Sequence, residues 1–294
     1  MSAKVIGHRG SRGLLPELSL AGFQKALDLG VDGIEIDVGV TADGHVVAYH
    51  DYTLNPNITR TANGKWLQST GELICTLTLE ELGQFDIGRI NPDSDYHHEF
   101  PQQDPVDGSL IPTLQQIVEL VRRNETEVTY CVEAKRSPTR PHLTVGVNEF
   151  AETLVSEIHR IGIAAQTIIQ AFDWSVIRQI KSIDSSLRIW HLTSRLAQFN
   201  TVDDDKFGVW TDGFELNHYG GSIPKMVLAA RGDVWCSDYQ SLSADAVGEA
   251  HDLGLAVYCW TVNETRDFER MFQAQVDGMI SDYPDRLIRF VEDL

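Results

Sequence analysis

Short apolar runs alternate along this chain with longer segments in which apolar residues recur at helical spacing. The short runs predict strands at KVIGH (4–8), GIEIDV (33–38), VTYCVEAK (128–135), TIIQAF (167–172), LRIWHL (187–192), DVWCSDY (233–239), LAVYCWTV (255–262) and DGMISDY (277–283). The helical spacing predicts helices within residues 18–30, 114–123, 150–162, 174–183, 244–254 and 285–294. Because strand and helix alternate over eight units, we expect a (β/α)8 barrel rather than an open sheet.

Three segments interrupt this alternation. The run DGFELN (212–217) is a ninth strand candidate, and it is either the sixth strand itself or part of an extra loop. The segment VTADGHVVAYHD (40–51) predicts a hairpin that turns at Asp43-Gly44. Residues 51–110 carry many turn residues and little periodicity, so they predict an insertion after the second strand, near the active-site end. We therefore expect residues 1–294 to form a single barrel domain with one insertion.

The composition is that of a soluble globular protein, with 42% hydrophobic residues and a mean hydropathy of -0.19. Its 43 acidic and 24 basic residues give a formal charge of -19, which argues against nucleic acid or an anionic membrane surface as partner. A small anionic substrate stays compatible with this charge, because a local cation can dominate one pocket. The chain shows neither a membrane-length apolar run nor a secretion signal, and a cytoplasmic protein is expected.

Carboxylates lie at alternate positions in two of the predicted strands. Glu35 and Asp37 share one strand face, and Glu133 shares another face with Lys135. Three inward carboxylates without cysteine form a hard oxygen site, suited to one divalent cation, Mg²⁺ or Ca²⁺. The alternative is a buried salt bridge between Lys135 and Glu35 or Asp37, but one lysine does not neutralise three acids.

Two histidines end predicted strands near the same end of the barrel. His8 closes the first strand and His50 closes the hairpin strand, which suits a general acid and a general base around a bound substrate. A lone histidine at a strand end is more often structural, so the argument depends on the pair. Arg9 and Lys135 add fixed positive charge that suits a phosphate oxyanion.

These residues, in this order, resemble the glycerophosphodiester phosphodiesterase family, and the match runs through most of the chain. Any one of its motifs is weak, whereas the ordered set is specific. The matching segments are HRG (8–10), PE (16–17), EID (35–37), HD (50–51), TLNPNITRTANGK (53–65), LEELGQFDIG (79–88), IPTL (111–114), VEAK (132–135), WTVN (260–263) and DGMISDYPD (277–285).

The resemblance implies a TIM barrel that hydrolyses glycerophosphodiesters to glycerol 3-phosphate and an alcohol, as part of lipid and glycerol metabolism. It further implies a role for each candidate residue. By this likeness, the cation ligands are Glu35, Asp37 and Glu133, the acid–base pair is His8 and His50, the phosphate contacts are Arg9 and Lys135, and the substrate contacts are Glu17 and Trp260.

One departure from the family concerns the loop after the PE pair. The family usually has asparagine and then threonine or serine there, whereas this chain has Leu18 and Ser19. Because leucine cannot form a side-chain hydrogen bond, this loop must be held in another way near Glu17.

Two other functions fit parts of the pattern. A lysophospholipase D or sphingomyelinase D-like enzyme would need an apolar trough, which Trp66, Phe85 and Phe100 of the insertion could supply. A catalytically silent binding barrel would be favoured if a histidine or a carboxylate of the set were missing, and all are present. Which histidine is the base, and whether water or the glycerol 2-hydroxyl attacks first, stays open at this point.

Overall fold

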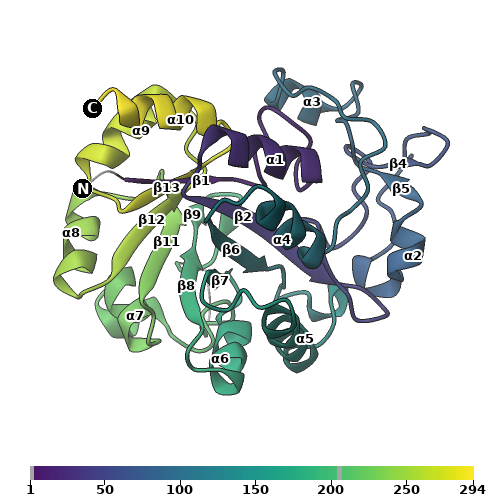
Figure 1. Ribbon diagram of the computed structural model, residues 1–294. Coiled ribbons are helices and arrows are strands. Elements are labelled where there is room, and N and C mark those ends of the chain that lie inside the picture. The colour runs from purple at the N-terminus through teal and green to yellow at the C-terminus, as the bar shows by residue number, and fades with distance from the viewer. Residues whose placement is uncertain (1–2, 204–206) are drawn as a thin grey trace.

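The computed structural model describes residues 3–203 and 207–294, and within them eight parallel strands close into a barrel (Figure 1). The barrel closes through β1, which pairs with both β13 and β2. Lys4 lies opposite Gly278 of β13, and Ile6 lies opposite Gly33 of β2. This confirms the predicted TIM barrel. The barrel strands are β1 (Lys4–Gly7), β2 (Gly33–Val40), β6 (Thr129–Ala134), β7 (Thr167–Ala171), β8 (Arg188–Thr193), β11 (Val234–Asp238), β12 (Ala256–Trp260) and β13 (Gly278–Ser281).

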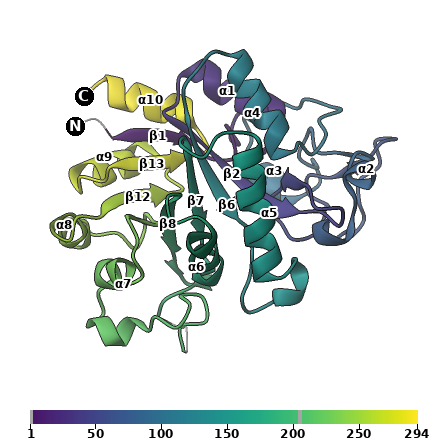
Figure 2. The same cartoon turned by 60° about the horizontal axis from the view of Figure 1, so that its bottom comes forward.

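Helices surround this barrel on the outside (Figures 1 and 2). They begin and end where local signals predict: Ser19 caps α1 by accepting a hydrogen bond from the Gly22 N–H, and Gly30 ends that helix at φ 81°. The helices of the barrel are α1 (Leu20–Leu29), α4 (Leu114–Arg123), α5 (Val147–Arg160), α6 (Trp174–Ile183), α7 (Ile223–Ala229), α8 (Ala244–Asp252), α9 (Thr265–Gln273) and α10 (Pro284–Glu292).

The sixth barrel strand is β11, so residues 212–217 belong to the long connection that follows β8. Asp212 and Gly213 have φ values of 54° and 88°, which lie outside the β region of regular strands. The chain then forms a short 3-10 helix, η3 (Leu216–Tyr219), before α7. The second of the two alternatives for this run, part of an extra loop, is therefore correct.

The predicted hairpin is present, because β3 (Val46–Ala48) pairs antiparallel with the end of β2, with Val38 opposite Ala48. The chain then leaves the barrel and returns at α4. This segment, at the right of Figure 1, holds β4 (Arg60–Thr61), η1 (Ile74–Thr76), α2 (Leu79–Leu82), β5 (Phe85–Asp86) and α3 (Asp95–Glu99). It packs around its own buried cluster, which includes Leu54, Ile58 and Leu82 and also contacts Tyr283 at the barrel. The division into one domain with an insertion stays a prediction.

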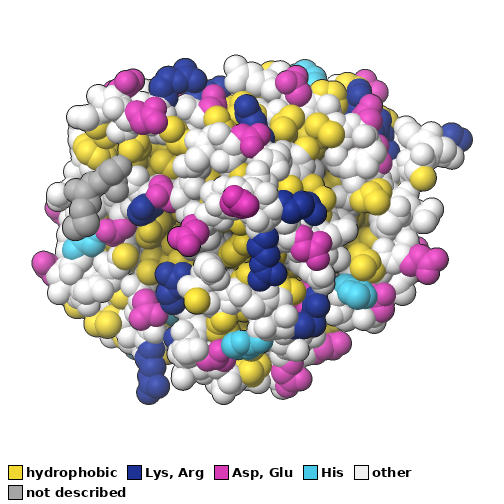
Figure 3. Space-filling view, viewed as in Figure 1, with side chains coloured by type: hydrophobic (Ala, Val, Ile, Leu, Met, Phe, Trp, Pro, Cys, Tyr) yellow, Lys and Arg dark blue, Asp and Glu magenta, His cyan; other side chains and the backbone are white. Residues whose placement is uncertain are grey.

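The remaining short elements lie in loops: η2 (Pro141–Leu143) after β6, and the hairpin of β9 (Arg195–Leu196) and β10 (Phe199–Asn200) after β8. Cys131, Cys236 and Cys259 are buried free thiols. None of the helices within residues 3–203 and 207–294 has the length and apolar character needed to cross a bilayer. On the face shown in Figure 3, Lys and Arg side chains are interspersed with Asp and Glu.

Candidate active site

A cavity of about 680 Å³ opens where the barrel strands end and their loops begin. Its position matches the end at which barrels of this kind build their sites. All the predicted site residues except Glu17 line this cavity: His8, Arg9, Glu35, Asp37, His50, Glu133, Lys135 and Trp260.

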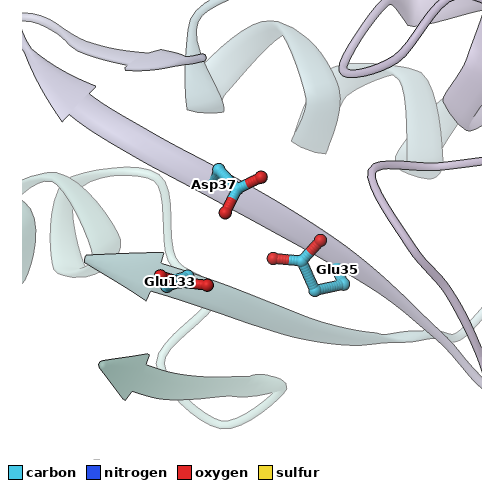
Figure 4. A group of neighbouring side chains, drawn as sticks. All are labelled: Glu35, Asp37 and Glu133. Atoms are coloured by element: carbon cyan, nitrogen blue, oxygen red, sulfur yellow. The ribbon is translucent and has the colours of Figure 1, made fainter. Parts of the chain in front are cut away.

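Three buried carboxylates meet at one side of the cavity (Figure 4). Glu35 and Asp37 point the same way from β2, and strand pairing places Glu133 of β6 directly opposite Asp37. One oxygen of each carboxylate lies within 4.8 Å of the other two. The period-two spacing in the sequence thus becomes a compact oxygen cluster.

Among the described residues, the three carboxylates of this cluster have only two cationic side chains beside them, Arg9 and Lys135. Lys135 donates from Nζ to Glu133 Oε1 at 2.8 Å and lies 3.4 Å from Asp37 Oδ1, so the salt bridge considered from the sequence exists beside the cluster. Burial and the charge of Asp37 nevertheless raise the pKa of Glu35 well above its usual value. Burial also raises the pKa of Glu133 to about 7, although Lys135 opposes this.

Asp37 behaves differently from its two neighbours. Burial alone would raise the pKa of Asp37, but Lys135 and Arg9 lower it below its usual value, so this carboxylate is ionised. Its Oδ2 lies 3.0 Å from Arg9 Nε but is not aligned for a hydrogen bond, and it finds no other hydrogen-bond partner among the described residues. A buried, orphaned carboxylate oxygen beside two acids of raised pKa fits a divalent cation with oxygen ligands.

In each of the two histidines, Nδ1 forms a hydrogen bond with a neighbouring carboxylate. His8, which follows β1, has Nδ1 2.7 Å from Asp282 Oδ1, and His50 has Nδ1 2.8 Å from Asp51 Oδ1. Asp282 and Asp51 are ionised, because the charge of Arg12 lowers the pKa of Asp282 and the hydrogen bond with His50 lowers the pKa of Asp51, each against the effect of burial. A carboxylate only accepts hydrogen bonds, so it fixes the proton on Nδ1 and leaves Nε2 of each imidazole for chemistry.

Both imidazoles are neutral at pH 7. Burial lowers the pKa of His8 to about 4, against the opposing charge of Asp282. Burial also lowers the pKa of His50, and Arg9 and Lys135 add to this effect. His8 Nε2 lies 3.9 Å from Glu35 Oε2, which places the imidazole beside the carboxylate cluster.

Asp282 belongs to the candidate site by its contacts, although the sequence pattern did not single it out. Besides His8, it accepts two hydrogen bonds from Arg12, at 2.7 and 3.0 Å, and one from Asn263 Nδ2 at 2.8 Å. Asp282 directly follows β13, which pairs with β1 just before His8. In a closed barrel the first and last strands are neighbours, so the residue after the last strand is expected near the residue after the first. This rule could have identified Asp282 from the sequence.

Glu17 lies outside the cavity wall, buried behind Arg9. One of its oxygens accepts a hydrogen bond from Arg9 Nη1 at 2.8 Å, and the other accepts one from the hydroxyl of Tyr96. Arg9 in turn donates its backbone N–H to Glu35 at 3.0 Å. Glu17 therefore holds Arg9 in place, and a direct contact with substrate stays a prediction.

The glycine of the HRG motif is required by the backbone conformation of this loop. Gly10 takes a φ of 84°, and a Cβ there would lie 2.7 Å from the carbonyl carbon of Gly22. The unusual Leu18 also takes a left-handed φ of 54°, and its N–H donates to the Arg9 carbonyl at 3.0 Å. Leu18 is buried in the core, so packing and a backbone hydrogen bond hold the loop instead of a side-chain hydrogen bond.

Aromatic rings from the barrel loops form another wall of the cavity. Phe172 lies between Phe199 and Trp260, with ring centroids 4.9 and 5.5 Å away in edge-to-face contacts. Trp210 extends this wall with its centroid 5.3 Å from that of Phe199. Of these rings, the sequence predicted Trp260 alone.

The three aromatic residues of the insertion that could have supplied an apolar trough do not form one at this cavity. Phe100 is buried in the insertion's own cluster, Phe85 packs against that cluster, and the Trp66 ring lies under the Arg60 guanidinium. None of these three aromatic residues lines the cavity. These three aromatic side chains instead serve contacts within the insertion itself.

Comparison with known proteins places this geometry in a family context. The model of the glycerophosphoryl diester phosphodiesterase family matches residues 8–286. A glycerophosphodiester phosphodiesterase from Caldanaerobacter subterraneus subsp. tengcongensis is 30% identical over 99% of this chain and 98% of its own length.

Two solved structures share the fold. A provisionally assigned glycerophosphoryl diester phosphodiesterase from Silicibacter pomeroyi has a TM-score of 0.88 and 30% identity, over 99% of this chain and 94% of that chain. A phosphodiesterase from Oleispira antarctica, solved in complex with the product sn-glycerol-3-phosphate, has a TM-score of 0.72 and 20% identity, over 99% of this chain and 97% of that chain.

Proposed function

Because the chain belongs to the glycerophosphoryl diester phosphodiesterase family of hydrolases, we propose that it cleaves a glycerophosphodiester into glycerol 3-phosphate and an alcohol, with His8 and His50 as its acid–base pair. One observation carries this proposal. Two neutral imidazoles, each with Nδ1 held by a carboxylate, line one cavity with three clustered carboxylates.

Glu35, Asp37 and Glu133 would hold one divalent cation, Mg²⁺ or Ca²⁺. When bound, such a cation polarises phosphoryl oxygens and lowers the pKa of a bound hydroxyl or water. Lys135 stands beside these carboxylates and Arg9 is anchored by Glu17, so both present fixed positive charge to a phosphate in the cavity.

The histidines divide the two proton transfers. One imidazole accepts at Nε2 the proton of the attacking hydroxyl, and a new bond forms from that oxygen to phosphorus. The bond from phosphorus to the departing alcohol breaks, and the other histidine, which first takes up a proton from solvent at Nε2 beside the anionic diester, gives that proton to the departing oxygen. Each transfer of this kind contributes about 10²–10⁴-fold to the rate. Asp282 and Asp51 keep the two rings oriented while the charge on each changes.

A lysophospholipid is the second candidate substrate, because of the aromatic wall of Phe172, Phe199, Trp210 and Trp260. Such a wall excludes water and suits apolar groups as well as the carbon skeleton of glycerol, for which Trp260 is the proposed contact. A catalytically silent binding barrel gains no support, because both histidines and all three carboxylates meet at one cavity.

The test is release of glycerol 3-phosphate from glycerophosphocholine and glycerophosphoethanolamine, with Mg²⁺, with Ca²⁺ and with EDTA. We expect release that requires one of the two cations and stops in EDTA. Hydrolysis of lysophosphatidylcholine without hydrolysis of either water-soluble diester would favour the second candidate. No release from any of these substrates with either cation would refute the proposal.

A further inference from the structure

Tyr96 brings the insertion into contact with the catalytic end of the barrel. It lies on α3, within the insertion (Figure 1). Its ring packs edge to face on Phe100, with the centroids 5.2 Å apart. Phe100 is itself buried in the insertion's cluster, so the position of the Tyr96 ring is set by the packing of the insertion.

The Tyr96 hydroxyl makes two hydrogen bonds, one to each side of the site. It donates to Glu17 Oε2 and accepts from Arg12 Nη1 at 3.3 Å. Burial and the charge of Glu17 raise the pKa of Tyr96 above its usual value, so the hydroxyl keeps the proton that it donates. The Tyr96 hydroxyl therefore bridges the carboxylate of Glu17 and the guanidinium of Arg12.

Each of these two contacts leads on to a proposed catalytic group. Glu17 binds the guanidinium of Arg9, whose Nε lies 3.0 Å from Asp37 of the carboxylate cluster. Arg12 binds Asp282, which holds Nδ1 of His8. The first set of contacts serves the phosphate and cation side of the site, and the second serves the acid–base side.

We propose that Tyr96 is a positioning residue that couples the insertion to catalysis by fixing Arg9 through Glu17 and His8 through Arg12 and Asp282. Tyr96, which does not line the cavity, thus acts on the reaction through other side chains. Since each hydrogen bond is partly buried, losing the hydroxyl leaves a carboxylate oxygen and a guanidinium N–H short of a partner. This role rests on the proposed hydrolysis of glycerophosphodiesters.

The first test is Tyr96→Phe, which keeps the ring and removes the hydroxyl. We expect kcat for glycerophosphocholine to fall about 10- to 100-fold, the effect of a lost, partly buried hydrogen bond to a charged group. The thermal midpoint should fall by only a few degrees, because two hydrogen bonds are lost, and the Mg²⁺ affinity should stay close to wild type. The matched control is Tyr130→Phe, another buried tyrosine, which lies in the N-terminal half of β6 away from the cavity end and should leave kcat unchanged.

A double-mutant cycle with Glu17→Gln separates coupling from independent damage. If Tyr96 acts through Glu17, the double variant should lose much less than the product of the two single losses. A kcat of Tyr96→Phe within twofold of wild type, or fully multiplicative losses, would overturn the role of Tyr96 while the hydrolysis by wild type stands. A wild-type protein without turnover would instead refute the proposed function, and this role with it.

Discussion

The replacement Asp282→Asn should disable His8 while its ring stays in place. Asp282 is buried, and its carboxylate accepts hydrogen bonds from His8 Nδ1, Arg12 and Asn263. An amide in this place can donate its N–H₂ to Nδ1, which moves the imidazole proton to Nε2. Nε2 then faces the substrate as a donor, and the neutral ring can no longer accept a proton there.

The expected loss follows from these contacts. The same replacement in the triad of a serine protease lowers kcat by about 10⁴ through the wrong tautomer, and one acid–base group contributes about 10²–10⁴. We therefore expect kcat to fall by about 10²–10⁴, with a much smaller change in KM. Removing the anion also leaves the guanidinium of Arg12 without its bidentate partner, and breaking a buried ion pair costs about 3–5 kcal/mol of unfolding free energy.

The assay is steady-state hydrolysis of glycerophosphocholine at saturating Mg²⁺, paired with urea unfolding. Asp238→Asn is the matched control, because Asp238 is also a buried aspartate at the end of a barrel strand, and it accepts hydrogen bonds from Arg195 and Ser241. The control should lose stability and keep kcat per folded molecule. A wild-type kcat for Asp282→Asn would refute the orientation of His8 by Asp282.

Three further predictions concern the cation, pH and the core. Glu35→Gln should leave the cation-free protein as stable as wild type and abolish the rise in Tm on adding Mg²⁺, measured by calorimetry, because burial already raises the pKa of this acid. Burial lowers the pKa of His191 from 6.5 to about 3, so its contribution to stability is complete above pH 6.5 and is lost as pH falls towards 3. Between pH 7 and pH 5, wild type should lose about 2 kcal/mol more than His191→Phe in urea unfolding, and equal losses would contradict this. Leu18→Asn should lower the unfolding free energy by about 1–3 kcal/mol, because the lost burial of leucine exceeds the strain of about 1–2 kcal/mol that asparagine relieves at φ 54°.

The barrel and its carboxylates were predictable because they depend on local periodicity. Alternation within a strand puts Glu35 and Asp37 on one face, and neighbouring parallel strands bring Glu133 opposite Asp37 whatever the loops do. Helix α9 was missed because few of its residues are apolar and buried, chiefly Phe268 and Met271. The run at 212–217 misled because its composition favours a strand while Asp212 and Gly213 take left-handed backbone.

The partners of the site residues were not predictable from periodicity, because they depend on tertiary contacts. Asp282 meets His8 across the closure of the barrel, 274 positions along the chain. Tyr96 reaches Glu17 from an insertion whose irregular sequence carries no periodic signal. The place of Glu17 behind Arg9, and not in the cavity wall, likewise follows from a loop conformation and not from a pattern.

The most direct test of the acid–base assignment is the kcat of His8→Ala and of His50→Ala at saturating glycerophosphocholine and Mg²⁺, with Mg²⁺ binding measured on the same samples. The account predicts that each variant loses about 10²–10⁴ in kcat, while its fold and its affinity for Mg²⁺ stay close to wild type. Wild-type rates in both variants, with the cation bound, would contradict the claim that these two imidazoles move the protons of the reaction.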